Sequence, residues 1–340
     1  MASTENAAVK STPVAPQLGS PGLNEMLQAR VEVAEKLLRE SLMEGEPFLT
    51  DKINHLAIAG GKRFRVVFTL LSALYGEKPT ADQVYKAAVV VELTHLATLY
   101  HDDVMDEADR RRGADSANMR WGNSIAILAG DYLFAVASDM LADLGAATVS
   151  HFASTFRELV TGQMRETVGC AEGQDPIEHY MTVIQEKTGV LIAAAGFLGA
   201  EHSGAPVEVR DALHAFGRNM GQVFQIVDDI IDIWSDPEES GKVPGTDLRE
   251  GVFTLPVLYA MRQDDEVGAR LREILTGPVE DDALVEEALE LIKRSEGRER
   301  AQEQVQIYRD RAEAELGKLP ESEATTALRE LLGFALKRLG

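Results

Sequence analysis

Six aspartates of this chain stand in two groups that share one spacing. Each group reads Asp-Asp-x-x-Asp, and the six residues are Asp102, Asp103, Asp106, Asp228, Asp229 and Asp232. On a helix, positions i, i+1 and i+4 lie on one side, so each trio is expected to point one way. Carboxylates packed this closely repel one another unless a cation lies between them. Carboxylate oxygens without a nearby cysteine suit a hard ion, so the pattern predicts Mg2+ before Zn2+.

The surroundings of the two motifs favour a binding site over a solvated helix face, which is the usual role of a charge run. The apolar stretch VVVELTHLATLY precedes the first motif, and GQVFQIV precedes the second. Acidic residues at the end of a largely buried helix are costly without a partner. Three arginines, Arg110, Arg111 and Arg112, follow the first motif. Together these features indicate a metal-bridged polyanion, most simply a diphosphate.

Composition excludes several classes of partner. The chain has 340 residues and a net charge of -22, which argues against nucleic acid and against general electrostatic binding to an anionic membrane. The one cysteine, Cys170, predicts no disulfide framework and a reducing, cytoplasmic location. The longest apolar run, residues 189–200, is too short to span a bilayer, so no transmembrane segment is expected. Residues 1–22 lack the layout of a signal peptide and are expected to form a disordered tail.

From residue 23 onward the hydrophobic periodicity is helical, and no alternation of period two persists. The pattern predicts one all-α domain over residues 23–340 with about ten or more helices. The helices are expected near residues 23–38, 51–59, 64–75, 81–107, 124–144, 147–168, 177–199, 207–234, 258–275, 282–295, 298–316 and 322–339.

The helix expected over residues 81–107 carries the first motif near its C-terminal end. The helix dipole there makes bare carboxylates still less favourable without a metal. Thr98 and His95 lie one and two turns before Asp102, and Ala97 flanks them. Small groups beneath an acidic rim leave room for a long apolar tail. His95 by itself is more often a core histidine than a ligand.

Two further stretches place cations beside apolar helices. In GGKRFR, Lys62 and Arg65 follow two glycines, which fits either a helix C-cap with surface cations or a phosphate clamp. Lys187 and Thr188 precede the small-residue run AAAG, which suits a ligand with a charged head and an apolar tail. Five cations are then available to neutralise a diphosphate: Lys62, Arg65, Arg111, Arg112 and Lys187. Such a site favours departure of diphosphate, because metals and cations stabilise the leaving group and a dry cavity protects a carbocation.

The order and spacing of six stretches resemble the trans-isoprenyl diphosphate synthase family. They are GGKRFR, ELTHLATLYHDDVMDEADRRRG, GDYLF, KTG, GQVFQIVDDIIDIWSD and GKVPGTDLREGVFTLP. The likeness extends from about residue 23 to the C-terminus, and the doubled motif with these flanks is a strong signature. It implies a bundle of mostly antiparallel helices around a deep central cavity, usually in a homodimer. It also implies condensation of isopentenyl diphosphate with an allylic diphosphate by ionisation, alkene attack and proton loss, with the released diphosphate as the base.

The resemblance assigns roles to individual positions. It places Mg2+ on all six motif aspartates, against the allylic diphosphate. Its other contacts with the allylic substrate are Arg111, Lys187, Thr188, Gln225 and Lys242. Its contacts with isopentenyl diphosphate are Lys62, Arg65, His95 and Arg112. It assigns catalysis chiefly to Asp102, Asp103, Asp106, Lys187 and Asp228.

This sequence departs from the family pattern at one position. Many members have a lysine where Val252 stands, so one cation is missing near the allylic diphosphate. Three basic residues are candidates to replace it: Arg249, Lys337 and Arg338.

The segment ATLYHDDVMDEADRRRG most resembles the corresponding segment of long-chain synthases. Small residues, Ala97 and Thr98, stand where shorter-chain enzymes often carry an aromatic. We therefore expect a medium-to-long all-trans polyprenyl diphosphate, roughly C30–C50, from a deep cavity. Its floor is expected at Phe152 or Phe156, although either could equally be core packing.

Several alternatives stay open at this stage. A geranylgeranyl or farnesyl diphosphate synthase differs only in cavity depth, and Tyr100 could shorten the tunnel. A class I terpene cyclase usually pairs one such motif with a different metal motif. The two copies here, together with GGKRFR, argue against it. A non-catalytic partner subunit would have degraded motifs, and both are intact here. Peripheral membrane contact during product release and the need for a second subunit are undecided.

Overall fold

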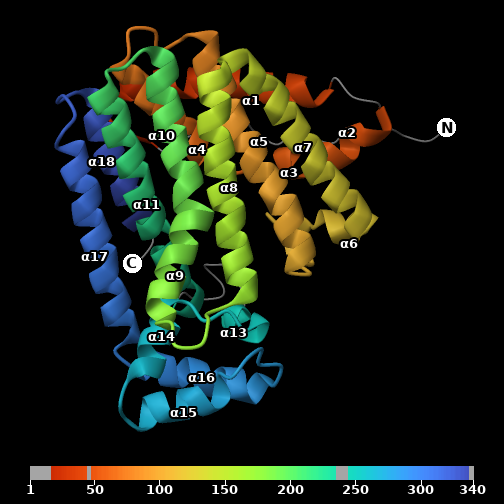
Figure 1. The fold of residues 1–340 in the computed structure, drawn as a ribbon, viewed down its shortest axis with the longest axis vertical. Helices are drawn as coiled ribbons and strands as arrows, with labels where there is room; N and C mark the ends of the chain where they lie inside the picture. The colour runs from red at the N-terminus through yellow and green to blue at the C-terminus, as the bar shows by residue number, and fades with distance from the viewer. Residues whose placement is uncertain (1–16, 44–46, 235–243, 337–340) are drawn as a thin grey trace.

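The structure is a computed structural model, and it describes residues 17–43, 47–234 and 244–336. Nearly all of this part of the chain is helical (Figure 1). The helices up to the first acidic motif are α1 (Pro21–Met43), α2 (Pro47–Ile53), α3 (His55–Ile58), α4 (Phe64–Ser72), the 3-10 turn η1 (Ala73–Tyr75) and α5 (Asp82–Met105). Those up to the second motif are α6 (Ala117–Trp121), α7 (Asn123–Leu144), α8 (Ala146–Val168), α9 (Pro176–Ile184), the π turn η2 (Gln185–Gly189), α10 (Val190–Ser203) and α11 (Val207–Trp234). The remainder are α13 (Thr246–Glu250), α14 (Leu255–Arg262), α15 (Glu266–Ile274), α16 (Asp282–Arg294), α17 (Gly297–Leu316) and α18 (Glu323–Leu336).

The all-α prediction is confirmed. Two strands of two residues each, β1 (Arg110–Arg111) and β2 (Ala114–Asp115), pair antiparallel just after the first motif. The helix predicted over residues 207–234 coincides with α11. The one predicted over 258–275 is wrong in extent, because it is split into α14 and α15. Asp265 starts the second piece, since its side chain accepts a hydrogen bond of 2.8 Å from the Gly268 nitrogen.

The tail predicted over residues 1–22 lies outside the described residues as far as residue 16. Leu18 is buried in the core with 2% of its surface exposed, and α1 begins at Pro21. The packed chain therefore begins before the predicted boundary at residue 23.

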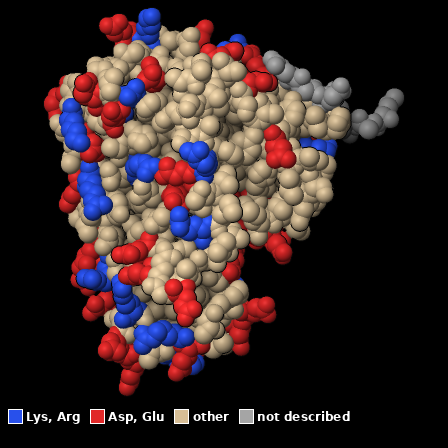
Figure 2. Space-filling view, viewed as in Figure 1, with Lys and Arg blue, Asp and Glu red and all other residues tan. Residues whose placement is uncertain are grey.

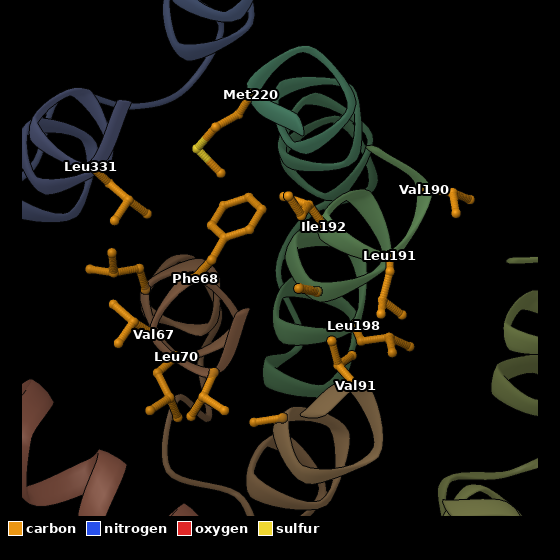
Figure 3. Packing of buried hydrophobic residues seen from close by; sticks show 14 of the residues in the cluster. Val67, Phe68, Leu70, Val91, Val190, Leu191, Ile192, Leu198, Met220 and Leu331 are labelled. Carbon is orange, nitrogen blue, oxygen red and sulfur yellow. The ribbon is translucent and has the colours of Figure 1, made fainter. Parts of the chain in front are cut away.

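The main core lies where α4, α10, α11 and α18 meet. Figure 3 shows the ring of Phe68 from α4 with Met220, Ile192 and Leu331 around it. All four side chains are buried. Burying each such side chain contributes about 1.5–3 kcal/mol, so this layer fixes how the helices that carry the motifs are placed.

Two glycines on α11 allow a very close approach to the preceding helix. A Cβ on Gly217 would lie 2.7 Å from the Cα of Ala193, and one on Gly221 would lie 2.5 Å from the Cα of Gly189. Only glycine permits such a distance to a neighbouring backbone. One turn after Gly221, the same face of α11 presents Gln225 to η2.

By length and composition alone, two described helical stretches could cross a membrane: Asn123–Leu144 and Pro176–Ser203. The sequence prediction had found none, because it considered only uninterrupted apolar runs. The second stretch is 72% buried within the bundle, as a core helix would be, whereas the first is 33% buried. The first stretch, which is α7, is therefore more exposed than the second.

Candidate active site

The two acidic motifs lie at the C-terminal ends of α5 and α11, but the first trio does not point one way. Asp103 is completely buried and accepts a hydrogen bond of 2.6 Å from Nε of Arg111. Asp102 and Asp106 instead line two different cavities. Successive residues on a helix are rotated by about 100°, so position i+1 can turn into the core while i and i+4 face the rim. Arg111, expected at the allylic diphosphate, is already paired with a carboxylate.

Several rim carboxylates hold their protons more tightly than usual. Burial raises the pKa of Asp102 to about 6, the Lys187 ammonium opposes that rise, and the Asp106 carboxylate adds to it. Burial also raises the pKa of Asp106. Burial raises the pKa of Asp229 to about 7, against hydrogen bonds from Tyr180 and Gln225. The protein's own cations thus compensate this negative charge only in part.

The π turn η2 presents Lys187, and a glycine on α8 makes this possible. A Cβ on Gly162 would lie 2.6 Å from Cβ of Glu186 and 2.8 Å from the nitrogen of Lys187. One turn further along α8, Glu166 forms an ion pair of 2.5 Å with Nζ of Lys187. Its neighbour Arg165 pairs with Glu186 at 2.9 Å. A π turn inside a helix is frequently a functional feature, and here two ion pairs hold it against α8.

A hydrogen-bonded chain links η2 to the second motif. The Thr188 hydroxyl donates to Oε1 of Gln225 at 3.1 Å, and Nε2 of Gln225 donates to Oδ1 of Asp229 at 3.0 Å. The Tyr180 hydroxyl donates to the other carboxylate oxygen of Asp229. These hydrogen bonds bring together three of the predicted site residues, Thr188, Gln225 and Asp229, and fix the orientation of their side chains.

A cavity of about 490 Å³ opens beside this chain, and we call it the polar cavity because several charged side chains line it. Its described lining carries five carboxylates and one lysine: Asp106, Glu166, Asp229, Asp247, Glu250 and Lys187. Apolar side chains of α9 and α14 also line it, among them Val183 and Leu258. The excess of acidic groups suits cations that would bridge the protein to a polyanion.

A second cavity of about 540 Å³ lies between α5, α7 and α8, and it is almost wholly apolar. Asp102 and Thr98 line it, so it begins at the acidic rim, and Thr98 is the one of the two predicted small residues that lines it. The rings of Phe134 and Phe156 also line it, with their centroids 4.5 Å apart. Such a cavity suits a hydrocarbon chain attached to a charged head.

The aromatic residues considered as cavity floors separate clearly. Phe156 lines the apolar cavity, whereas Phe152 is buried in the core and is not among the lining residues. Tyr100 is also buried, and its hydroxyl donates to the Lys52 carbonyl at 2.5 Å, away from the cavity. Ala97 is buried rather than lining.

The three cations of the stretch GGKRFR lie in different environments. Arg63 adopts a φ of 47°, turns inward and forms buried ion pairs with Glu35 and, at 2.6 Å, with Glu92. Lys62 stays exposed on the outer side. Arg65 points into the bundle, and burial lowers its pKa to about 10. Neither of the two interpretations of this stretch anticipated the structural role of Arg63.

Arg65 lies beside His95 and Arg112. Burial lowers the pKa of His95 well below its ordinary value, and the positive charges of Arg65 and Arg112 lower it further, so this imidazole is neutral. Arg112 donates to the carbonyl oxygens of Leu56, at 3.0 Å, and of Gly60. Four predicted contacts of isopentenyl diphosphate thus come from one region, with Lys62 at its edge.

The missing lysine is not replaced by Arg249. Val252 is 39% exposed and lines the polar cavity, whereas Arg249 pairs with Asp282 at 2.7 Å. Lys242, Lys337 and Arg338 lie outside the described residues.

No three described His, Cys, Asp or Glu side chains converge closely enough to hold a metal ion by themselves. Asp103 is held by Arg111, and Asp229 by Tyr180 and Gln225. The donor set is nonetheless all carboxylate, and its charge is incompletely compensated. These residues fit a hard divalent cation that takes its remaining ligands from a bound anion.

Sequence reasoning did not identify Glu166 and Tyr180 as site residues. Glu166 left a signal, because with Gly162 and Gln163 it interrupts the apolar pattern of α8. Tyr180 left none, since one tyrosine on an amphipathic helix is ordinary core material.

A family profile described as "Polyprenyl synthetase" matches residues 46–292. The chain belongs to the polyprenyl synthetase family. This polyprenyl synthetase is 51% identical to a nonaprenyl diphosphate synthase of Mycobacterium tuberculosis, over 95% of this chain and 96% of that one. It is 42% identical to a dimethylallyltranstransferase of the same organism, over 94% and 97%. A geranylgeranyl pyrophosphate synthase of Corynebacterium glutamicum, solved with calcium and isoprenyl diphosphate, is similar with a TM-score of 0.87, 58% identity and coverage of 96% and 100%.

Proposed function

We propose that this polyprenyl synthetase is a prenyltransferase that adds isopentenyl diphosphate head-to-tail to an allylic diphosphate. Its product is a medium-to-long all-trans polyprenyl diphosphate. One observation carries the proposal: a single turn of α5 separates Asp106, in the polar cavity, from Asp102, in the apolar cavity. The proposed substrate would place its diphosphate head by Asp106 and its hydrocarbon tail by Asp102.

The polar cavity is the proposed site of the allylic diphosphate. Asp102 and Asp106 would hold Mg2+ from the first motif, and Asp103 would join them by exchanging Arg111 for the metal. Asp228, Asp229 and Asp232 would hold it from the second motif. Bound there, Mg2+ supplies Lewis-acid stabilisation of the departing diphosphate. Lys187 adds a positive charge from η2, and the Thr188–Gln225 hydrogen bond keeps both side chains in place. Arg111 and Lys242 complete the proposed contacts.

Isopentenyl diphosphate is proposed to bind among Lys62, Arg65, His95 and Arg112. A neutral His95 fits this role, because it can donate a hydrogen bond to phosphate without adding to the repulsion between arginines. The allylic bond to diphosphate then breaks, the isopentenyl double bond attacks the carbocation, and a proton is lost to the released diphosphate. The apolar lining that begins at Thr98 keeps water from the carbocation.

Product length is proposed to be set by the Phe134–Phe156 pair at the apolar cavity. The similarity to a nonaprenyl diphosphate synthase supports a long chain of roughly C30–C50, which a deep cavity would hold. The second candidate is a geranylgeranyl diphosphate synthase, favoured by the 58% identity to the Corynebacterium enzyme. Both reactions use the same proposed residues and differ only in where growth stops.

We further propose that the protein is a cytoplasmic homodimer. Exposed apolar residues follow the outer faces of α7 and α8: Ile127, Leu128, Val160, Met164 and Val168. Figure 2 shows few charged side chains over α7 and the upper part of α8. A second copy on this face would cover the open side of the apolar cavity. We propose that the long apolar product leaves through peripheral contact with a membrane.

A product assay tests the proposal. Purified protein, Mg2+ and labelled isopentenyl diphosphate are incubated with geranyl, farnesyl or geranylgeranyl diphosphate, and the dephosphorylated products are separated by length. A ladder that ends at C30 or beyond supports the long-chain synthase. A sharp stop at C20 assigns the geranylgeranyl reaction instead. Absence of condensation with every starter contradicts a prenyltransferase that acts alone.

A further inference from the structure

The last helix of the described chain, α18, is firmly anchored at its start. Its N-terminus is capped by Ser322, whose hydroxyl accepts a hydrogen bond of 3.2 Å from the Thr325 nitrogen. Thr325 in turn shares a hydrogen bond of 2.7 Å with the Tyr75 hydroxyl. The Gly19 nitrogen donates to the Glu330 carboxylate, so the beginning of the described chain also holds this helix. The helix packs against α4, α11 and α17.

The final turn of α18 reaches the GGKRFR stretch. Nζ of Lys62 lies 5.4 Å from the centre of the Phe334 ring. Lys62 itself follows the Gly60–Gly61 turn, and a Cβ on Gly61 would lie 3.1 Å from the guanidinium carbon of Arg112. Lys62 therefore lies next to the proposed isopentenyl diphosphate contacts. Its ammonium lies over the ring of Phe334, which is 272 positions later in the sequence.

An aromatic ring and a carboxylate position a lysine side chain in different ways. The negative face of the ring attracts the ammonium, but it neither neutralises the charge nor occupies an N–H donor. Lys187 shows the contrast, because Glu166 competes for it with any incoming anion. Among the described residues, Lys62 makes no hydrogen bond or ion pair, and the Phe334 ring is its contact. Such a lysine stays fully available to a phosphate while its long side chain is kept near one place.

We propose that Phe334 is a positioning residue for Lys62, and that α18 thereby forms one wall of the isopentenyl diphosphate site. This inference rests on the proposed function. It predicts that the ring affects binding of isopentenyl diphosphate and not binding of the allylic substrate, which lies with Lys187 and Asp229.

Steady-state kinetics of Phe334→Leu and Phe334→Tyr test the proposal. Leucine keeps apolar bulk but removes the ring, and tyrosine keeps the ring. Tyr308→Leu is the matched control, because Tyr308 is a partly buried ring under Arg311 on the neighbouring helix α17, at 4.8 Å. Thermal unfolding of each variant is measured alongside, and Phe334→Met replaces Phe334→Leu if the latter does not fold.

For Phe334→Leu we expect KM for isopentenyl diphosphate to rise about two- to fivefold, with kcat and KM for the allylic diphosphate unchanged. Phe334→Tyr and Tyr308→Leu should behave as the wild type. In a Lys62→Met background, Phe334→Leu should have no further effect on this KM. An unchanged KM in Phe334→Leu, equal rises for both substrates, or an undiminished effect without Lys62 overturns the proposal. Failure of the proposed function looks different, because the wild type itself would then not condense the substrates.

Discussion

Gly162 packs directly against Lys187: a Cβ on residue 162 would lie 2.8 Å from the Lys187 backbone nitrogen. Gly162→Ala should therefore push α8 away from η2 and disturb the Glu166–Lys187 ion pair. We expect a loss of about 1–3 kcal/mol in the free energy of unfolding from overpacking. We also expect kcat/KM to fall by about 10- to 100-fold, because small displacements of a catalytic group are costly.

Gly22→Ala is the control for this change. Gly22 is also helical, and a Cβ there would meet only the Ser20 hydroxyl, at 4.0 Å. Its alanine variant should keep full activity and gain a little helix stability. Full activity in Gly162→Ala would show that the close approach to η2 does not matter for the reaction.

Stability without metal should fall as the pH rises through the range where Asp229 ionises. Its pKa is raised from 3.8 to about 7 in the folded protein, so the folded state binds more protons than the unfolded state between these values. The free energy of unfolding therefore decreases with pH from about 4 to 7 for this group. Urea unfolding in EDTA at about pH 5 and pH 8 should show a smaller decrease for Asp229→Asn than for the wild type. Mg2+ with inorganic diphosphate should restore more stability at the higher pH, and equal pH dependence of variant and wild type would contradict this assignment.

A lysine at position 252 should strengthen binding of the allylic substrate. Val252 lines the polar cavity, where five described carboxylates accompany one lysine. Val252→Lys adds a cation at a partly exposed position, which we expect to lower KM for farnesyl diphosphate by about three- to tenfold. Val207→Lys is the control, because Val207 is 54% exposed at the start of α11 and is not among the lining residues. An unchanged KM for Val252→Lys would show that the missing cation is not needed at this site.

Much of the helical layout was predictable because these helices bury a continuous apolar face. The spans of α7, α8, α11, α16 and α17 agree with the predicted ranges within about one residue. The break between α14 and α15 was missed, since both pieces continue the same periodicity and only the Asp265 cap separates them.

The residue types of the site were predictable, but not the way in which the protein pairs them. The sequence spacing predicted that Asp103 points the same way as Asp102 and Asp106. In the structure Asp103 is instead hydrogen-bonded to Arg111. Similarly, Glu166 reaches Lys187 only because α8 approaches η2 at Gly162. Such pairs depend on tertiary packing between distant segments, which local periodicity does not encode.

The two phenylalanines proposed as cavity floors should have different effects on product length. Phe156 lines the apolar cavity and packs against Phe134 with the two rings tilted, whereas Phe152 is 5% exposed and belongs to the core. Phe156→Ala should lengthen the longest product by one or more isoprene units. Phe152→Ala should leave product length unchanged and lower stability by about 3–5 kcal/mol. Separation of products by length, with thermal unfolding, checks both; longer products from Phe152→Ala alone would reverse the assignment.

The exposed apolar face of α7 provides the last prediction. Leu128 is 61% exposed and Ile127 is 43% exposed, on a helix that is only one-third buried. A stable interface typically buries about 1,600 Å² in total, and a charge at its apolar centre is strongly unfavourable. Leu128→Asp should therefore shift the protein from dimer to monomer in sedimentation experiments. Because the open side of the apolar cavity would lose its cover, the variant should also give shorter products. Ile307→Asp is the control, since Ile307 is 41% exposed on α17; a wild-type monomer, or a Leu128→Asp dimer, would contradict the proposed interface.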